Sequence, residues 1–294
     1  MLRRRLGSAS AFGYRHRSVG ALAQLTPGLV TFVGIYIAAL AVLFVSAFWS
    51  VDEFTGKLVH TWTTENFKTL WEGNAYHTIA LRTIGIAAAV TVTDAVLAFP
   101  IAYFIARIAT PRLRAGLFVA VLLPLWSSYL LRVYAWRLIL TRDGLLNWVL
   151  ERLGLPPANI AYTNVAVWLV FTYIWLPFMI IPVYAALERI PRSTIEASAD
   201  LGARGSRTFR SIVLPLALPG LVAGSIFTFA LTLGDYITPT LVGGTSSQFI
   251  GNVVYDSVGV SNNVPFAAAY ATVPLAVMGI YLLVAKRLGA FEAL

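Results

Sequence analysis

Six long apolar runs limit what this chain can fold into more than any other feature of its sequence. Each run is near or above the roughly 20 residues that an α-helix needs to cross the hydrocarbon core of a bilayer. The chain is 58% hydrophobic and only 12% charged, whereas ordinary soluble domains carry roughly 25% charged residues. We therefore exclude a soluble globular domain and predict an all-α membrane protein with six transmembrane helices. These cover about residues 27–48, 79–106, 115–138, 162–187, 216–242 and 265–285.

The distribution of basic residues predicts the orientation of these helices. Lys and Arg gather in the tail 1–26, the loop 107–114, the segment 188–215 and the C-terminus, and the alternate loops are neutral or acidic. Since Lys- and Arg-rich loops remain in the cytoplasm, both termini and residues 188–215 should face that side. The same distribution explains the net charge of +9 without a nucleic-acid partner. The first apolar run is too long for a signal-peptide core of roughly 7–15 residues, so we predict one transmembrane domain over residues 27–294.

The sequence lacks the residue patterns of an enzyme. It has no cysteine, which excludes disulfides and thiol catalysis, and its three histidines are scattered without metal-ligand spacing. We find neither a Ser-His pair nor paired carboxylates in the apolar runs, and no phosphate-binding Gly-x-x-x-x-Gly-Lys-Ser/Thr loop. We therefore expect no catalytic residue, metal or cofactor, and any ATP hydrolysis must belong to a separate subunit.

Residues 188–215 form the longest strongly charged segment between two apolar runs. Ser193 and Glu196 have the spacing of a capping box, Gly202 is a typical C-terminal stop, and Ser206 could cap a second short helix. The segment is therefore predicted to be a folded helix-turn-helix at the end of a membrane span. These residues alone leave two interpretations open, an amphipathic connector on the membrane surface and a docking surface.

Part of this segment resembles the EAA loop of the membrane subunits of binding-protein-dependent ABC importers. The matching residues are Glu196-Ala197-Ser198, Gly202 and Ile212-Val213-Leu214-Pro215, with Ser198 in place of the second alanine of the family. The resemblance implies a type I importer permease fold in the bacterial inner membrane, with a cytoplasmic coupling helix in a cleft of the ATPase. It also implies a second permease, two ATP-binding subunits and an extracytoplasmic solute-binding protein. The ATPase-coupling residues would be Glu196, Ala197, Asp200, Gly202, Ile212, Leu214 and Pro215.

A polar stripe in the fifth run suggests a path for a solute. Ser225, Thr228, Thr232, Asp235 and Thr238 are three or four residues apart and so lie near one face of a helix. A stripe that ends in an acid is typical of a face towards a water-filled path, although Ser and Thr can also bond their own backbone carbonyls. Asp94 in the second run could equally contact a solute or make a buried structural hydrogen bond.

Aromatic residues of the third run extend this candidate path. Tyr129, Arg132 and Trp136 share a helix face, and such rings can bind cations or form an interfacial belt. Asp235 could pair with Arg132 or with a cationic solute. Gly220 and Gly224 form a Gly-x-x-x-Gly pair that predicts close helix packing. The full set of candidate path residues is Asp235, Tyr236, Thr232, Thr228, Asp94, Trp126, Tyr129 and Trp136.

Two further stretches are similar to the polyamine subgroup of these permeases. They are Ser-Ser-Tyr-Leu-Leu-Arg-Val-Tyr-Ala-Trp at 127–136, followed by Gly-Leu-Leu-Asn at 144–147, and Gly-Asp-Tyr at 234–236 with Thr-Pro at 238–239. This similarity implies spermidine or putrescine uptake. Importers of an aminophosphonate, an opine-type compound or chelated iron are the alternatives within the family. A secondary transporter, which would use intramembrane acids as ion relays, is the alternative outside it.

Overall fold

The computed structural model describes residues 17–52, 55–245 and 247–287, with side chains from residue 25 onwards. The predicted basic tail 1–26 therefore lies mostly outside the described residues. Among the described residues, the regular structure is helical apart from one antiparallel hairpin that pairs Ser50 with Val59. Its elements are α2 (Arg17–Ser46), β1 (Ser50–Val51), β2 (Leu58–Val59), α3 (Glu65–Glu72), α4 (Asn74–Tyr103), the π turn η1 (Phe104–Ile108), α5 (Pro111–Trp126), α6 (Tyr129–Leu140), α7 (Leu145–Arg152), α8 (Asn164–Arg189), α9 (Arg192–Asp200), α10 (Gly205–Thr208), the π turn η2 (Phe209–Val213), α11 (Leu214–Gly234), α12 (Ile237–Val242), α13 (Ile250–Gly259) and α14 (Val264–Arg287).

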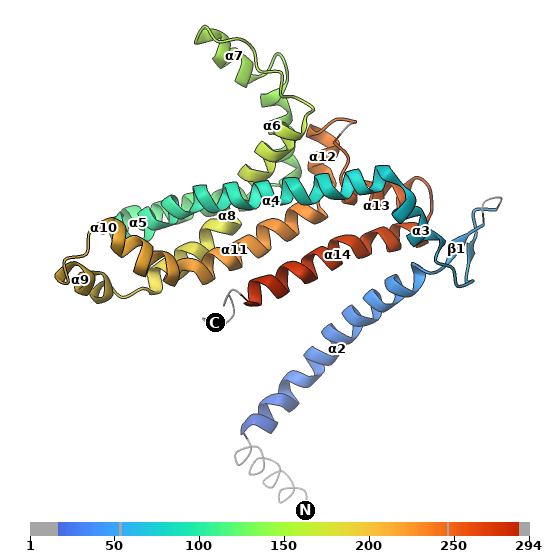
Figure 1. Ribbon diagram of the computed structural model, residues 1–294, viewed down its shortest axis with the longest axis horizontal. Coiled ribbons are helices and arrows are strands. Elements are labelled where there is room, and N and C mark those ends of the chain that lie inside the picture. Colours follow the sequence, from blue (N-terminus) through green and yellow to red (C-terminus); the bar gives the residue numbers. More distant parts are fainter. Residues whose placement is uncertain (1–16, 53–54, 246, 288–294) are drawn as a thin grey trace, which may run out of the picture.

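Helices α4, α8 and α11 form the centre of the molecule, and α14 runs beside them (Figure 1). Their shared core contains small and branched apolar side chains such as Ala98, Met179 and Val183. Helices α9 and α10 lie at one end of this bundle, which we call the α9 end. The β1–β2 hairpin, α3 and α13 lie at the other, which we call the hairpin end.

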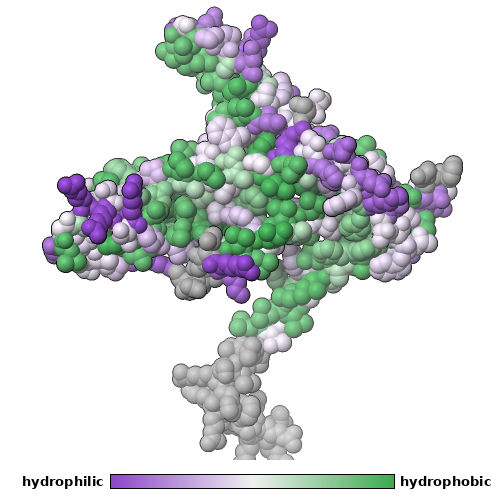
Figure 2. Space-filling model, in the orientation of Figure 1, coloured by the Kyte–Doolittle hydropathy of each residue, from purple (hydrophilic) through white to green (hydrophobic). Residues whose placement is uncertain are grey.

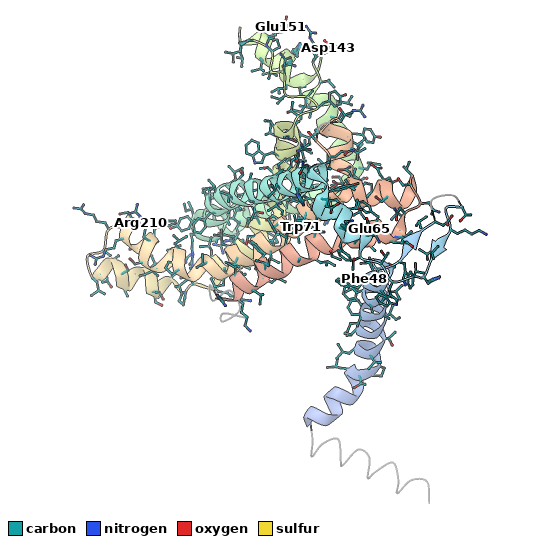
Figure 3. The ribbon with its side chains drawn as sticks, turned by 45° about the vertical axis from the view of Figure 1, so that its right-hand side comes forward. Phe48, Glu65, Trp71, Asp143, Glu151 and Arg210 are labelled. Atoms are coloured by element: carbon teal, nitrogen blue, oxygen red, sulfur yellow. The ribbon has the colours of Figure 1, made fainter. Side chains whose placement is uncertain are left out.

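The described residues contain five helices that are long and apolar enough to cross a membrane, or six spans if the bent pair from Pro111 to Arg152 counts as one. Apolar side chains cover the middle of the bundle, whereas hydrophilic ones gather at its two ends and at the tip of α7 (Figure 2). In Figure 3, Arg210 projects at the α9 end, Glu65 lies at the hairpin end, and Asp143 and Glu151 lie at the tip formed by α6 and α7. This separation is the one expected for an apolar belt inside a bilayer.

The third predicted span, 115–138, is not one straight helix. Helix α5 ends at Trp126 and α6 begins at Tyr129, and the two segments are bent by 92°. Ser127 has extended backbone, and its hydroxyl donates to the carbonyl of Pro124 at 2.7 Å. Pro124, and Ser127 with its hydroxyl bonded to the local backbone, thus interrupt an apolar run that hydropathy alone predicts as continuous.

The fifth predicted span, 216–242, also has other bounds. Helical structure is continuous from Gly205 to Gly234, and the chain breaks there before the short α12. The π turn η2 immediately precedes Pro215, whose ring would clash with a carbonyl one turn earlier in a regular α-helix. The segment 243–264, between the fifth and sixth apolar runs, contains α13. The short helix α7 lies between the third and fourth apolar runs.

The predicted close packing at Gly220 and Gly224 is confirmed. A β-carbon at Gly220 would lie 2.5 Å from the side chain of Ala186 and 2.5 Å from the carbonyl of Pro182, and one at Gly224 would lie 2.6 Å from Met179. Helices α8 and α11 therefore approach so closely that only glycine fits at these two contacts.

Candidate functional site

Helix α9 presents three of the seven predicted coupling residues on its open face. Glu196, Ala197 and Asp200 are exposed, whereas Ser198 and, in part, Ile195 face the remainder of the chain. Leu201, directly after the helix, is 88% exposed. Leu201 extends the exposed face that carries the two carboxylates, although a single exposed leucine is ordinary on a protein surface. The sequence analysis missed Leu201, although its position beside Gly202 could have indicated it.

The two ends of α9 are stabilised differently from one another. The helix begins after Pro191 without a side-chain cap, so the predicted capping box of Ser193 and Glu196 is wrong. A proline that fixes the backbone before the first turn takes its place. At the other end Gly202 has a φ of +75°. Its N–H donates to Ala199, and the N–H of Ala203 donates to Ser198, which is the Schellman arrangement. The predicted stop at Gly202 is thus confirmed.

The remaining coupling residues belong to the start of the next membrane helix. Ile212 lies in η2 and Leu214 and Pro215 begin α11. The predicted cap at Ser206 is wrong, because α10 begins after Arg204 with no side-chain hydrogen bond. Helix α9 is joined to α10 by a buried hydrogen bond of 2.9 Å between the hydroxyls of Ser198 and Thr208.

Near the hairpin end, Asp235 lies in the break between α11 and α12. Its Oδ1 accepts the N–H groups of Ile237 at 2.7 Å and Thr238 at 3.1 Å, so the carboxylate caps α12. Its Oδ2 accepts the hydroxyl of Tyr129 from α6. Asp235 therefore holds three elements together, and a cavity of about 340 Å³ opens beside it.

This cavity combines a carboxylate with aromatic walls. Tyr129 stacks on Trp175 with 5.8 Å between ring centroids and an interplanar angle of 14°. Tyr236, Gly234 and apolar residues of α11 complete the lining. Asp235, Tyr236 and Tyr129, predicted together as path residues, thus share one pocket. Trp175 was missed, although aromatic residues at 168, 171, 175 and 178 have the spacing of one helix face.

The anticipated pairing of Asp235 with Arg132 is absent from the described residues. No basic group there lies within 4.0 Å of the Asp235 carboxylate, and the guanidinium of Arg132 lies 6.0 Å from the ring centre of Tyr129 instead. The negative charge of Asp235 is accordingly hydrogen-bonded but has no cationic partner in this part of the chain.

The other predicted path residues are dispersed. The hydroxyls of the fully buried Thr228 and Thr232 donate to carbonyls of their own helix at 3.2 and 2.7 Å. Asp94 is fully buried in α4 and neither of its oxygens has a hydrogen-bond partner among the described residues. Trp126 is 81% exposed at the end of α5, and Trp136 packs on Tyr173. None of these residues lines the Asp235 pocket.

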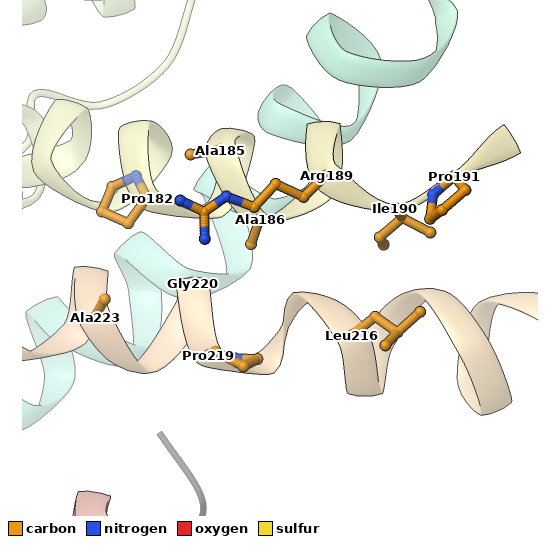
Figure 4. Close-up of a pocket in the computed structure, with 10 residues that line it drawn as sticks. All are labelled: Pro182, Ala185, Ala186, Arg189, Ile190, Pro191, Leu216, Pro219, Gly220 and Ala223. Carbon is orange, nitrogen blue, oxygen red and sulfur yellow. The ribbon is translucent and has the colours of Figure 1, made fainter. Parts of the chain in front are cut away.

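A second cavity of about 340 Å³ lies between α8 and α11 towards the α9 end. Its lining is apolar except for Arg189, whose guanidinium extends along α8 over Ala186 towards Pro182 (Figure 4). Pro219 and Gly220 form the opposite wall on α11.

Comparison with known proteins agrees with this architecture. Residues 17–289 match the family described as "Binding-protein-dependent transport system inner membrane component". The chain belongs to this family. The permease is 45% identical to the inner membrane ABC transporter permease protein YdcU of Escherichia coli (strain K12), over 98% of this chain and 96% of that protein. It is 32% identical to the spermidine/putrescine transport system permease protein PotB of the same organism, over 88% and 95% of the two chains.

Solved structures show the same fold. A bacterial ABC transporter involved in the import of the acidic polysaccharide alginate has a chain that matches with a TM-score of 0.66 and 18% identity, over 95% of this chain and 99% of that one. A chain of the MetNI methionine ABC transporter matches with a TM-score of 0.58 and 18% identity, over 77% and 98%. The permease is thus an all-α membrane protein with the type I importer fold. It is a transport subunit and not an enzyme, and ATP hydrolysis belongs to separate subunits.

Proposed function

We propose that this permease forms the membrane path of an importer for polyamines, together with a second permease, two ATP-binding subunits and an extracytoplasmic solute-binding protein. The observation that carries the proposal is the Asp235 pocket. It places a carboxylate without a cationic partner among the described residues beside the stacked rings of Tyr129 and Trp175. Both features favour binding of a protonated amine. Its positive charge is attracted by the carboxylate, and each contact with an aromatic face contributes roughly 0.5–2 kcal/mol of binding free energy.

Two relatives support the same solute class. PotB of Escherichia coli is named as a spermidine/putrescine permease, and PotC, of the same named system, is 34% identical over 38% of this chain. A system with two related permeases also supports a heterodimer as the working unit. The mechanism we propose is alternating access, in which ATP closes the ATPase dimer, α9 moves with it and the permease pair opens outward.

Uptake into liposomes that contain the assembled complex tests the solute. We expect ATP-dependent accumulation of radiolabelled spermidine and putrescine in the presence of the binding protein. Excess unlabelled polyamine should compete, whereas methionine and alginate oligosaccharides should not. Transport of an aminophosphonate, an opine-type compound or an iron chelate without polyamine transport would contradict the polyamine proposal and leave the importer itself intact.

We also propose that the α9 end and both termini face the cytoplasm, as the positive-inside distribution predicts. The chain has no cysteine, so single cysteines at the exposed Ser261 and Arg204 report on the two sides. An impermeant thiol reagent should label Ser261→Cys in intact cells and Arg204→Cys only after permeabilisation. The reverse pattern would invert the topology.

A further inference from the structure

Arg107 connects the coupling segment to the central helix α4. It lies in η1, the π turn that continues α4, and its guanidinium donates hydrogen bonds to the carbonyls of Leu187 and Ile190. The second of these bonds is 2.6 Å long. Leu187 is in the last turn of α8, and Ile190 is the residue that follows this helix and precedes Pro191 and α9.

The chemistry of this contact favours a firm connection. The last carbonyls of a helix have no intrahelical partner and carry a partial negative charge, so a guanidinium satisfies them particularly well. Both hydrogen bonds come from one terminal nitrogen of the guanidinium, Nη2, whose two N–H groups can each reach one carbonyl. Arg107 therefore binds the backbone at the junction where α8 ends and α9 begins.

Neighbouring contacts hold the backbone around Arg107 in place. Others connect the chain that follows α9 to α4. Arg114 of α5 donates to the carbonyls of Ile105 and Ala106, the two residues just before Arg107, at 3.1 and 3.0 Å. Beyond α9, the ring of Phe209 packs edge-on against Phe99 of α4 at 5.4 Å. The C-terminal end of α4, together with η1, is thus in contact with the chain both before and after α9.

We propose that Arg107 is a positioning residue that transmits the movement of α9 to α4. The inference rests on the proposed coupling role of α9. Helix α4 packs along both α8 and α11. A displacement of its C-terminal end would therefore also move these two helices. The ring of Tyr103, the last residue of α4 before the π turn η1, lies 6.5 Å from the ring of Phe209 in the π turn η2, and π turns often occur at functional sites.

Nitroxide labels on single cysteines test the proposal in the assembled complex. One label at the exposed Val96 reports on α4, and another at the exposed Ala199 reports on α9. We expect both spectra to change when ATP is trapped in the ATPase dimer. In Arg107→Ala the response at Ala199 should remain and the response at Val96 should fall about tenfold, the order expected when charge-assisted hydrogen bonds are lost.

Two further variants sharpen the result. Arg107→Lys should give an intermediate response, because an ammonium keeps the charge and the N–H donors but is more strongly hydrated and is carried on a flexible stem. Arg112→Ala is the matched control, since Arg112 is exposed in the first turn of the neighbouring helix α5 and makes no hydrogen bond or ion pair with any described residue. It should respond as the unmodified chain does.

The outcomes separate this inference from the coupling role itself. An undiminished response at Val96 in Arg107→Ala would overturn the role of Arg107 alone. Loss of the responses at both Val96 and Ala199 would show that Arg107 shapes the docking surface and does not transmit movement. An absent response at Ala199 in the unmodified chain would contradict the coupling role of α9 and with it the proposed function of the α9 end.

Discussion

The α9 end and the Asp235 pocket carry their candidate residues in different ways. At the α9 end, Glu196, Ala197 and Asp200 are neighbours on one short exposed helix, and a glycine with positive φ closes it. At the Asp235 pocket, Tyr129, Trp175 and Asp235 come from three separate elements and meet only after folding. The first surface is formed by residues close together in the chain and faces outward, whereas the second is a pocket assembled from distant parts of the chain. Changes at the first should therefore affect energy transfer, and changes at the second should affect the solute.

The largest effect is expected at the Asp235 pocket. Asp235→Asn keeps one oxygen for the N–H groups of Ile237 and Thr238 but removes the charge. We expect solute uptake to fall about 100-fold, because losing one partner of a buried charge pair costs roughly 2–5 kcal/mol. Assembly of the complex should be retained.

Uptake assays in proteoliposomes, with assembly followed by co-purification, measure this effect. Asp256→Asn is the matched control, since Asp256 is an exposed acid of α13. Uptake by Asp235→Asn at the level of the unmodified complex would show that the carboxylate only caps α12. The Asp235 pocket would then have no demonstrated role in transport of the solute.

The next effect is uncoupling at the α9 end. Gly202 has a φ of +75°, a conformation that costs an L-residue roughly 1–2 kcal/mol and a β-branched one more. We expect Gly202→Val, and also Glu196→Lys through its reversed charge on the docking face, to reduce solute-stimulated ATP hydrolysis about tenfold, a loss that corresponds to roughly 1.4 kcal/mol.

The control for this pair is Gly205→Ala, because Gly205 has no positive φ and a β-carbon there would meet nothing within 4 Å. Stimulation of ATP hydrolysis by the solute-loaded binding protein is the quantity to compare. Normal stimulation in both Gly202→Val and Glu196→Lys would refute the assignment of α9 as the coupling helix.

A third change tests the packing that connects the two regions. A β-branched residue at Gly220 would collide with Ala186 and with the carbonyl of Pro182, both 2.5 Å from the first added carbon. We expect Gly220→Val to destabilise the subunit by roughly 1–3 kcal/mol, the usual cost of overpacking. Gly279→Val in α14, where nothing lies within 4 Å, should have a much smaller effect on thermal unfolding in detergent. Equal effects in the two variants would mean that α8 and α11 separate easily.

The contrast between the regions also explains what could be predicted from the sequence. The apolar runs, the EAA-like pattern and the Gly202 stop depend on residues close together in the chain, and the comparisons or the structure support each of them. The break at Asp235 depends on a carboxylate that caps a helix of only six residues, Ile237–Val242, inside an apolar run. Hydropathy does not register such a cap. The capping box failed because Pro191 already fixes the backbone at the start of α9.

The smallest effect is expected at the contact between α9 and α10. Ser198→Ala removes the 2.9 Å hydrogen bond to Thr208, and a neutral hydrogen bond contributes about 1 kcal/mol. The hydroxyl of Thr208 has a second acceptor, the carbonyl of Arg204 at 3.5 Å, so it is not left without a partner. Alanine is also the residue that the EAA pattern has at this position. We therefore expect a loss below about 1 kcal/mol and unchanged coupling. Thr208→Val in the Ser198→Ala background should add less than it does alone, because the two hydroxyls share one bond. A strong loss of coupling in Ser198→Ala, without loss of stability, would place part of the coupling function on the buried face of α9, so that the exposed face would not account for coupling alone.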